Sequence, residues 1–137
     1  MERSLILETT FLIDFERERA RRETGAGHVF LRAHAGHRLL LTHTIAGELA
    51  AGKSLSKRGA WEAFTAPFRV LPWTPDVDWE YGKAFRFLQA NGLMIDANDL
   101  WIAATAVAHA IPLVTRNVDH YRRVPGLEVV AYGCEAQ

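Results

Sequence analysis

The sequence predicts an α/β protein, a three-layer α/β/α sandwich around a central, mainly parallel sheet of four to five strands. Two observations predict this class. Runs of consecutive apolar residues at 4–7, 39–41 and 111–114 are typical of parallel strands that are buried on both faces. Longer stretches of helical character separate these runs, and strands that alternate with helices give a parallel sheet with helices on both faces.

The length of 137 residues suits a single domain over residues 1–137, which can bury roughly 68% of the surface of its unfolded chain. A hydrophobic fraction of 49% is that of a globular protein with an ordinary core. We see no internal repeat, linker or low-complexity segment.

The first expected strand, residues 4–7, leads directly into a charged and polar segment. Thr9 and Thr10 have side chains suited to helix N-caps, so we expect a helix over residues 11–17. The charge-dense run at residues 16–23 is interpreted as a solvated face or a loop.

A second helix is expected over residues 28–37, with Val29, Phe30 and Ala33 on one side. This segment carries three histidines without a matching spacing of cysteines or acids, which predicts surface or capping roles rather than a metal site. The three are His28, His34 and His37.

The next strand, residues 39–41, precedes a helix that carries Glu48 and that Thr42 or Thr44 can cap. A further helix is expected over residues 56–66.

The strand at residues 68–71 ends at Pro72, because proline has no N–H to donate to a strand ladder. Residues 77–90 predict a long amphipathic helix that ends at Asn91 and Gly92.

Residues 99–110 predict a helix rich in alanine, which can pack close to the sheet. The strand at 111–114 follows, and residues 127–130 are the expected last strand.

The 16 acidic and 16 basic residues cancel, so net charge supplies no general attraction to nucleic acid. The single cysteine, Cys134, excludes an internal disulfide and a thiolate metal cluster, and it is interpreted as an inert tail thiol. Neither a signal peptide nor a run of 18 apolar residues is present, so we expect a cytoplasmic protein that does not contact a membrane.

Acidic residues follow apolar segments at three distant places: Glu8 after the first strand, Glu48 in its helix, and Asp96 with Asp99 at a helix start. Ligands of open α/β sheets bind beyond the carboxyl ends of the strands, so these acids can meet at one edge. Crowded carboxylates repel one another unless a proton or a metal ion compensates them. A divalent cation site is therefore predicted.

Other interpretations stay open for each residue alone. Asp96 and Asp99 are typical N-cap or first-turn acids, and Glu48 suits an exposed helix position. Thr115 and Asn117 suit a turn. A buried Glu8 is harder to explain in this way, because buried acids require partners.

Four segments together resemble the PIN-domain ribonucleases of the VapC toxin type. Residues 7–14, Leu-Glu-Thr-Thr-Phe-Leu-Ile-Asp, resemble the family's opening strand-Asp-Thr-x-x-Leu-Ile-Asp. Residues 44–49 resemble its Ser/Thr-x-x-x-Glu-Leu segment, and residues 95–106 its Ile-x-x-x-Asp-x-x-Ile-Ala-Ala-x-Ala segment. Residues 113–127 resemble its closing segment.

The resemblance implies cleavage of RNA by Mg²⁺ or Mn²⁺ chemistry, with the acids as metal ligands. The implied metal ligands are Glu8, Glu48, Asp96 and Asp99, and the implied catalytic residues are Glu8, Glu48 and Asp99. The implied substrate or ligand-orienting residues are Thr9, Thr115, Arg116 and Asn117. For Arg116, a surface salt bridge is an equal alternative.

The resemblance also implies a VapB-type antitoxin as partner, and a homodimer. Aromatic residues offer candidate partner surfaces, namely Trp61, Phe64, Phe85 and Phe87. The tryptophans are interpreted as core or interface anchors rather than a base-stacking platform; they are Trp61, Trp73, Trp79 and Trp101.

Two positions depart from the family: Asn117, where some relatives carry another acid, and Glu8, where the family has aspartate. The departure at Glu8 matters more. The extra methylene extends the side chain by about 1.5 Å, and a misplacement near 1 Å can lower a rate about a hundredfold. The alternatives are a catalytically weakened RNA- or protein-binding module and a structure-specific DNA nuclease. A response-regulator-like domain lacks the expected paired acids and late lysine.

Overall fold

The structure is a computed structural model that describes residues 3–133. Its centre is a five-stranded sheet with the order β3-β2-β1-β4-β5, in which every neighbouring pair is parallel. The strands are β1 (Ser4–Leu7), β2 (Arg38–Leu41), β3 (Arg69–Val70), β4 (Leu113–Thr115) and β5 (Val129–Ala131). The predicted α/β class with a parallel sheet is confirmed.

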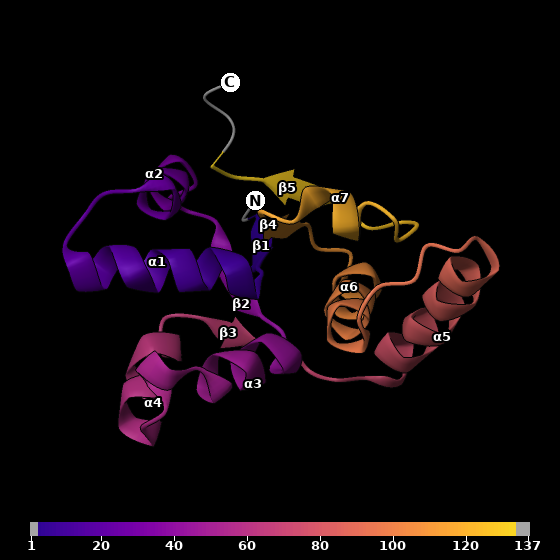
Figure 1. The fold of residues 1–137 in the computed structure, drawn as a ribbon, viewed down its shortest axis with the longest axis horizontal. Coiled ribbons are helices and arrows are strands. Elements are labelled where there is room, and N and C mark those ends of the chain that lie inside the picture. Colours follow the sequence, from indigo (N-terminus) through magenta and orange to yellow (C-terminus); the bar gives the residue numbers. More distant parts are fainter. Residues whose placement is uncertain (1–2, 134–137) are drawn as a thin grey trace.

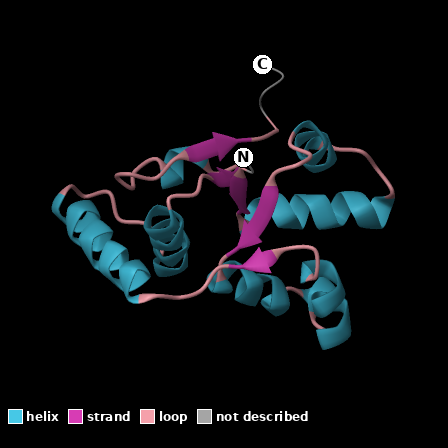
Figure 2. Cartoon of the chain, turned by 180° about the vertical axis from the view of Figure 1, so that it is seen from behind, coloured by secondary structure: helices cyan, strands magenta, loops and turns pink. Residues whose placement is uncertain are grey.

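Helices connect the strands and lie on both sides of the sheet (Figure 1). They are α1 (Thr9–Arg21), α2 (Ala26–Ala33), α3 (His43–Ala51), the 3₁₀ helix η1 (Lys53–Leu55), α4 (Arg58–Thr65), α5 (Pro75–Ala90), α6 (Ala97–His109) and α7 (Val118–Tyr121). Figure 2 shows the same arrangement from behind, with α1 and α2 on one side of the sheet and α5 and α6 on the other.

The core lies between the central strands and the helices that cover them. Ile6 and Leu7 of β1 and Leu113 and Val114 of β4 are fully buried, as expected for strands covered on both faces. The small side chains of α6 explain its close packing, since Ala103 is fully buried in the same core cluster.

Helix α1 begins earlier than predicted, and its cap is a different residue. Thr9 and Thr10 are the first residues of the helix, so the prediction that they cap it is wrong. Glu8 is the N-cap, and its side chain accepts a hydrogen bond from the backbone N–H of Thr10. A glutamate can do this because its carboxylate turns back over its own backbone.

The charge-dense run at residues 16–23 belongs mostly to α1, which extends to Arg21, and Arg17, Arg19 and Arg21 are exposed as predicted. Glu18 departs from the prediction, because its carboxylate is mostly buried and accepts hydrogen bonds from Gly25, Gly27 and His28.

Helix α2 ends at Ala33, four residues before the predicted end. The backbone turns out of the helix there, and Gly36 has a φ of +98° that suits glycine.

Other boundaries moved by a few residues. Strand β3 is reduced to two residues at an edge of the sheet. The predicted helix over residues 56–66 is α4, with η1 before it. Thr42 is the cap of α3, since its hydroxyl accepts a hydrogen bond from the N–H of Ile45 at 3.1 Å. Helix α7 was not predicted.

All three histidines are half-buried, and only His34 and His37 contact backbone carbonyls in the manner of the predicted capping role. His28 pairs with Glu18 at 2.5 Å. His34 Nδ1 lies 2.8 Å from the carbonyl of Phe30, and His37 Nδ1 lies 3.1 Å from the carbonyl of His34. Cys134 lies outside the described residues.

The aromatic residues divide between core and surface. Trp101 packs against Tyr81 at 3.7 Å and against Trp73 at 4.7 Å between ring centroids. Trp79 is 62% exposed, so it is not a core residue.

Among the candidate partner residues, Phe64 is buried, which removes it from the predicted partner surface. Trp61 is half-buried and donates to the carbonyl of Ala46, Phe85 is half-buried, and Phe87 is exposed. Within residues 3–133, no helix has the length and apolar character needed to cross a membrane.

Candidate active site

Polar side chains gather where the parallel strands β1 and β4 end side by side. Glu8 follows β1, and Thr115 is the last residue of the neighbouring β4. The Thr115 hydroxyl donates to Oε1 of Glu8 at 2.6 Å, and the Thr10 hydroxyl donates to the same oxygen at 2.6 Å. The carboxylate of Glu8 is therefore held by residues from two elements.

Glu8 is a buried acid, with 4% of its surface exposed. Burial raises the pKa of its carboxyl group, the hydrogen bonds from Thr10 and Thr115 lower it, and the nearby charge of Asp99 raises it again. The net result is a raised pKa. Glu8 and Asp99 thus lie close enough to repel each other.

Glu48 reaches the same region from α3, whose start is fixed by the Thr42 cap. The hydroxyl of Thr9, on the first turn of α1, donates to Oε1 of Glu48 at 2.5 Å. This contact joins α1 to α3 beside Glu8.

Asp99 lies in the first turn of α6, and two successive residues of α7 bind its two carboxylate oxygens. The hydroxyl of Tyr121 donates to Oδ1 at 2.9 Å. Nε2 of His120 lies 2.9 Å from Oδ2.

Tyr121 shows that the three acids share one region. Burial raises the pKa of its hydroxyl far above the usual range, and the charges of Glu8, Asp99 and Glu48 raise it further. We call Glu8, Glu48 and Asp99 the acidic edge. Asp99 contacts this hydroxyl directly, and the charges of Glu8 and Glu48, which come from two other segments of the chain, act on it as well.

The remaining predicted residues lie around this edge. Asp96 is the exposed N-cap residue of α6, and its side chain makes no cap hydrogen bond. Asn117 is exposed, and its backbone N–H donates to the hydroxyl of Thr115 at 3.0 Å. Arg116 is 60% exposed and forms an ion pair with Asp14 at 2.8 Å.

Asp14 connects Arg116 to the end of the described chain. The hydroxyl of Tyr132 donates to Oδ2 of Asp14 at 2.8 Å, and the guanidinium of Arg116 lies 5.5 Å from the Tyr132 ring centroid. Burial and the carboxylate of Asp14 raise the pKa of Tyr132. This group ties the loop after β4 to α1.

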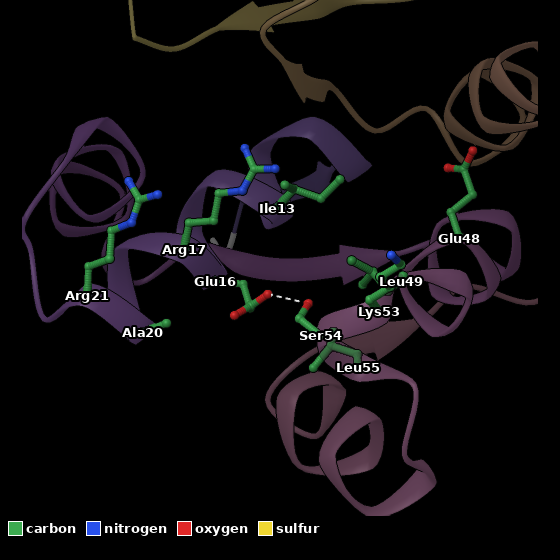
Figure 3. Close-up of a pocket in the computed structure, with 11 residues that line it drawn as sticks. Ile13, Glu16, Arg17, Ala20, Arg21, Glu48, Leu49, Lys53, Ser54 and Leu55 are labelled. Atoms are coloured by element: carbon green, nitrogen blue, oxygen red, sulfur yellow. Dashed lines mark hydrogen bonds between the residues drawn. The ribbon is translucent and has the colours of Figure 1, made fainter.

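A groove of about 410 Å³ between α1 and the α3–η1 segment has Glu48 in its lining. Figure 3 shows Glu48 at one end and Arg21 at the other. Arg17, Arg21 and Lys53 also line it, and no ion pair joins these three to an acid within residues 3–133. Glu16 lines the groove as well, so three cationic and two acidic side chains meet beside the acidic edge.

The sequence profile of the PIN domain matches residues 5–127. The chain belongs to the PIN-domain family. This PIN domain is 30% identical over 130 residues to the protein named Ribonuclease VapC of Rickettsia bellii, which covers 92% of this chain and 94% of the relative. It is 27% identical over 124 residues to Ribonuclease VapC1 of Methanocaldococcus jannaschii, over 90% of this chain and 82% of that relative.

Solved structures of similar fold include VapBC2 from Rickettsia felis bound to a promoter DNA fragment, with a TM-score of 0.78. The two chains are 21% identical, and the match covers 94% of this chain and 98% of that chain. VapBC-1 from nontypeable Haemophilus influenzae has a TM-score of 0.77 and 25% identity, over 93% and 97% of the two chains. The chain is a VapC-type PIN domain.

The acidic edge of this PIN domain has the donor chemistry of a hard cation site. Its candidate ligands are carboxylate oxygens, which Mg²⁺ and Mn²⁺ prefer, and the charge of Asp99 adds to the raised pKa of the buried Glu8. No group of three or more His, Cys, Asp or Glu side chains within residues 3–133 is spaced as a ready metal cage. The carboxylate groups are of the kind that binds these ions. In this structure they accept hydrogen bonds from protein hydroxyl groups instead.

The sequence did not single out Thr10, His120 or Tyr121 as site residues of this PIN domain. His120 and Tyr121 belong to the four-residue helix α7, which is too short to leave a periodic signal. The sequence does not indicate that the Tyr121 hydroxyl contacts Asp99, because the two residues lie 22 positions apart in different helices.

Proposed function

We propose that this PIN domain is a metal-dependent endoribonuclease, the toxin of a VapBC-type toxin–antitoxin pair. The observation that carries the proposal is the arrangement of Glu8, Glu48 and Asp99, whose carboxylates accept hydrogen bonds from Thr115, Thr9 and Tyr121 where β1 and β4 end. The similarity to proteins named Ribonuclease VapC supports RNA as the substrate.

The acidic edge would bind Mg²⁺ or Mn²⁺ through Glu8, Glu48 and Asp99, with Asp96 contributing through water. When bound, the ion lowers the pKa of a bound water and neutralises charge on the phosphate oxygens. Tyr121 and His120 orient Asp99, and Thr9 orients Glu48.

We assign Thr9 and Thr115 to orienting carboxylates rather than to direct contact with RNA, because their hydroxyl protons already point at Glu48 and Glu8. Arg116, which is exposed beside the end of β4, and Asn117 next to it would contact the substrate. The groove lined by Arg17, Arg21 and Lys53 offers a path for the phosphate backbone toward Glu48.

A VapB-type antitoxin is the proposed partner, as the names of the similar VapBC structures suggest for those proteins. We also propose a homodimer, with the exposed Phe87 and Trp79 of α5 in a partner surface. Elution of the purified chain as a monodisperse monomer would contradict the dimer.

The substitution Asp99→Asn tests the catalytic assignment. We expect it to abolish EDTA-sensitive cleavage of RNA while circular dichroism shows an unchanged fold. Asp119→Asn, which changes an exposed acid next to His120 in α7, is the matched control and should cleave as the original chain does. Retained cleavage by Asp99→Asn would refute the assignment. Preferential cleavage of DNA in parallel assays would show that DNA, and not RNA, is the substrate.

The second candidate function is a catalytically weakened binding module. One observation favours it: the Glu8 carboxylate is directed at Thr10 and Thr115, so it must release or share these donors to bind an ion. A chain that binds RNA or antitoxin without Mn²⁺-dependent stabilisation or cleavage would support this alternative.

A further inference from the structure

Two histidines between α2 and β2 have their ring tautomer fixed by the backbone. His34 Nδ1 lies 2.8 Å from the carbonyl oxygen of Phe30, and His37 Nδ1 lies 3.1 Å from the carbonyl oxygen of His34. A carbonyl oxygen only accepts hydrogen bonds, so each neutral ring carries its proton on Nδ1. The unshared electron pair that can bind a metal ion is therefore on Nε2 of both rings.

The Nε2 atoms of His34 and His37 have no hydrogen-bond or ion-pair partner among residues 3–133. Metal-binding histidines commonly show this pattern, because a hydrogen bond from one ring nitrogen to a carbonyl group orients the other nitrogen toward the ion. His28, the third histidine of this region, differs, since its ring is bound to the carboxylate of Glu18. Only His34 and His37 are therefore arranged as metal ligands.

The spacing of the two rings matches that of two imidazoles on one tetrahedral ion. Zinc binds a histidine nitrogen at about 2.0–2.1 Å, and the ring centre lies about 1.2 Å behind that nitrogen, so each ring centre is about 3.2 Å from the ion. At a tetrahedral angle, two such ring centres are about 5.2 Å apart. The ring centroids of His34 and His37 are 5.1 Å apart. Stacking on the Phe30 ring, with 3.9 Å between centroids, holds the His34 ring in place.

Both rings line a cavity with room for the water molecules that such an ion requires. The cavity has a volume of about 760 Å³, and the two charged side chains in its lining, Arg3 and Glu128, are of opposite sign. No further His, Cys, Asp or Glu completes a group of three around the pair in the part of the chain that the structure describes. Water would therefore fill the remaining positions of a tetrahedral ion.

The cavity lies at the ends of the strands that are opposite to the acidic edge. Its lining includes Ser4, the first residue of β1, together with Pro112 and Glu128, which directly precede β4 and β5. The acidic edge lies instead where β1 and β4 end. An ion in this cavity is thus separate from any ion at the acidic edge.

We propose that His34 and His37 bind a divalent transition-metal ion of the zinc class through their Nε2 atoms. Imidazole nitrogen suits Zn²⁺, whereas Mg²⁺ and Mn²⁺ prefer carboxylate and water oxygens, so this site does not compete for the ion proposed at the acidic edge. The bound ion ties the end of α2 to the start of β2. Its binding does not depend on the proposed ribonuclease activity.

A zinc titration of the natural chain, followed through the ¹⁵N NMR signals of the histidine rings, tests the site. Before zinc is added, His34 and His37 should show the Nδ1–H tautomer. His109 should show the Nε2–H tautomer, because its Nε2 lies 3.1 Å from the carbonyl oxygen of Pro72. We expect the Nε2 signals of His34 and His37 to move together, at zinc concentrations at least about tenfold below those that affect the single ring of His109, since the second ligand binds the ion intramolecularly. Excess MgCl₂ should not reverse these shifts.

Two substitutions test whether the rings act as a pair. In His37→Gln, the His34 ring should need at least about tenfold more zinc, because the ion loses one of its two protein ligands. His34→Gln should weaken binding at His37 in the same way, and it keeps the backbone carbonyl that His37 contacts. His109→Gln is the matched control and should leave the zinc response of both rings unchanged. Circular dichroism checks that each variant is folded, and the titration of the natural chain requires no substitution.

Three results would overturn the inference. One is a response of His34 and His37 that begins no earlier than that of His109, and another is the Nε2–H tautomer in either ring before zinc is added. The third is zinc that moves only the ring of His120, which would place the ion beside Asp99 at the acidic edge. Joint movement of His34 and His37 in a chain that does not cleave RNA would support the zinc site while contradicting the proposed function.

Discussion

The hydroxyl of Tyr121 lies 2.9 Å from Oδ1 of Asp99 and donates a hydrogen bond to it from a side chain that is only 1% exposed. The pKa of this hydroxyl is raised by burial and by the acidic edge around it, so Tyr121 stays a neutral donor at neutral and moderately alkaline pH. Asp99 therefore has a permanent partner that does not neutralise its charge.

The substitution Tyr121→Phe removes this donor and little else. We expect the free energy of unfolding to fall by about 1.5–3 kcal/mol, because Asp99 loses a hydrogen bond to a charged acceptor in a partly buried place. Urea denaturation measures the change. Tyr81→Phe, which alters a half-buried tyrosine in α5 away from the acidic edge, should change stability by less than about 0.5 kcal/mol.

Replacement of Glu8 by glutamine should change how stability depends on pH in EDTA. The pKa of Glu8 is raised above 4.5 in the folded chain, so the folded state binds the proton of this carboxyl group more tightly than the unfolded state does. The resulting stabilisation of the fold is fully present below pH 4.5 and is lost as the pH rises through the folded-state pKa. We expect Glu8→Gln to gain stability relative to the natural chain between pH 4.5 and neutrality. Urea unfolding across that range measures this, and a difference that does not vary with pH would contradict it.

The linkage has the opposite sign at Glu18. Burial raises the pKa of its carboxyl group, but hydrogen bonds from the His28 side chain and from the N–H groups of His28, Gly27 and Gly25 outweigh burial and lower the pKa. Its stabilisation is present above pH 4.5 and is lost as the pH falls through the lowered folded-state pKa.

We therefore expect Glu18→Gln to lower the free energy of unfolding by about 1–3 kcal/mol at neutral pH and by less in acid. Thermal or urea unfolding at several pH values is the measurement. Glu62→Gln serves as the control, because its pair with Arg58 is exposed and 3.7 Å long, and such pairs contribute little. A pH-independent loss in Glu18→Gln would count against the assignment.

Arg116→Ala separates the two roles considered for this residue. Its ion pair with Asp14 is exposed, so the loss of stability should be at most about 1 kcal/mol. If Arg116 contacts the phosphate backbone, KM for RNA should rise and the salt dependence of binding should weaken. An unchanged KM would leave Arg116 as a structural partner of Asp14 alone.

Much of the fold could be predicted because its signals are local. The apolar runs at β1, β2 and β4 mark buried parallel strands, and Asn91 ends α5 where the sequence indicated. Boundaries at α2 and β3 were less accurate, since a short edge strand and a helix end depend on tertiary contacts.

The site could be predicted in its acids but not in their partners. Glu8 directly follows β1, Asp99 lies in the first turn of α6, and Glu48 lies within α3, the helix that follows β2. A parallel sheet brings the ends of such strands to one edge. The contact between Glu8 and Thr115 joins residues 107 positions apart, and no periodicity reports such a pair. Tyr121 was missed for the same reason, since only the folded chain shows where its hydroxyl points.

Strand β1 (Ser4–Leu7) lies in the middle of the sheet and pairs with β4 (Leu113–Thr115), although residues 8–112 separate the two strands. Residues 4–115 must therefore all have left the ribosome before β4 can dock beside β1. Prematurely terminated products that lack residues 115–121 leave Glu8 without the Thr115 hydroxyl and Asp99 without the Tyr121 hydroxyl. Under the proposed function, this order of assembly would keep an unfinished toxin harmless to the RNA of the translation machinery that makes it.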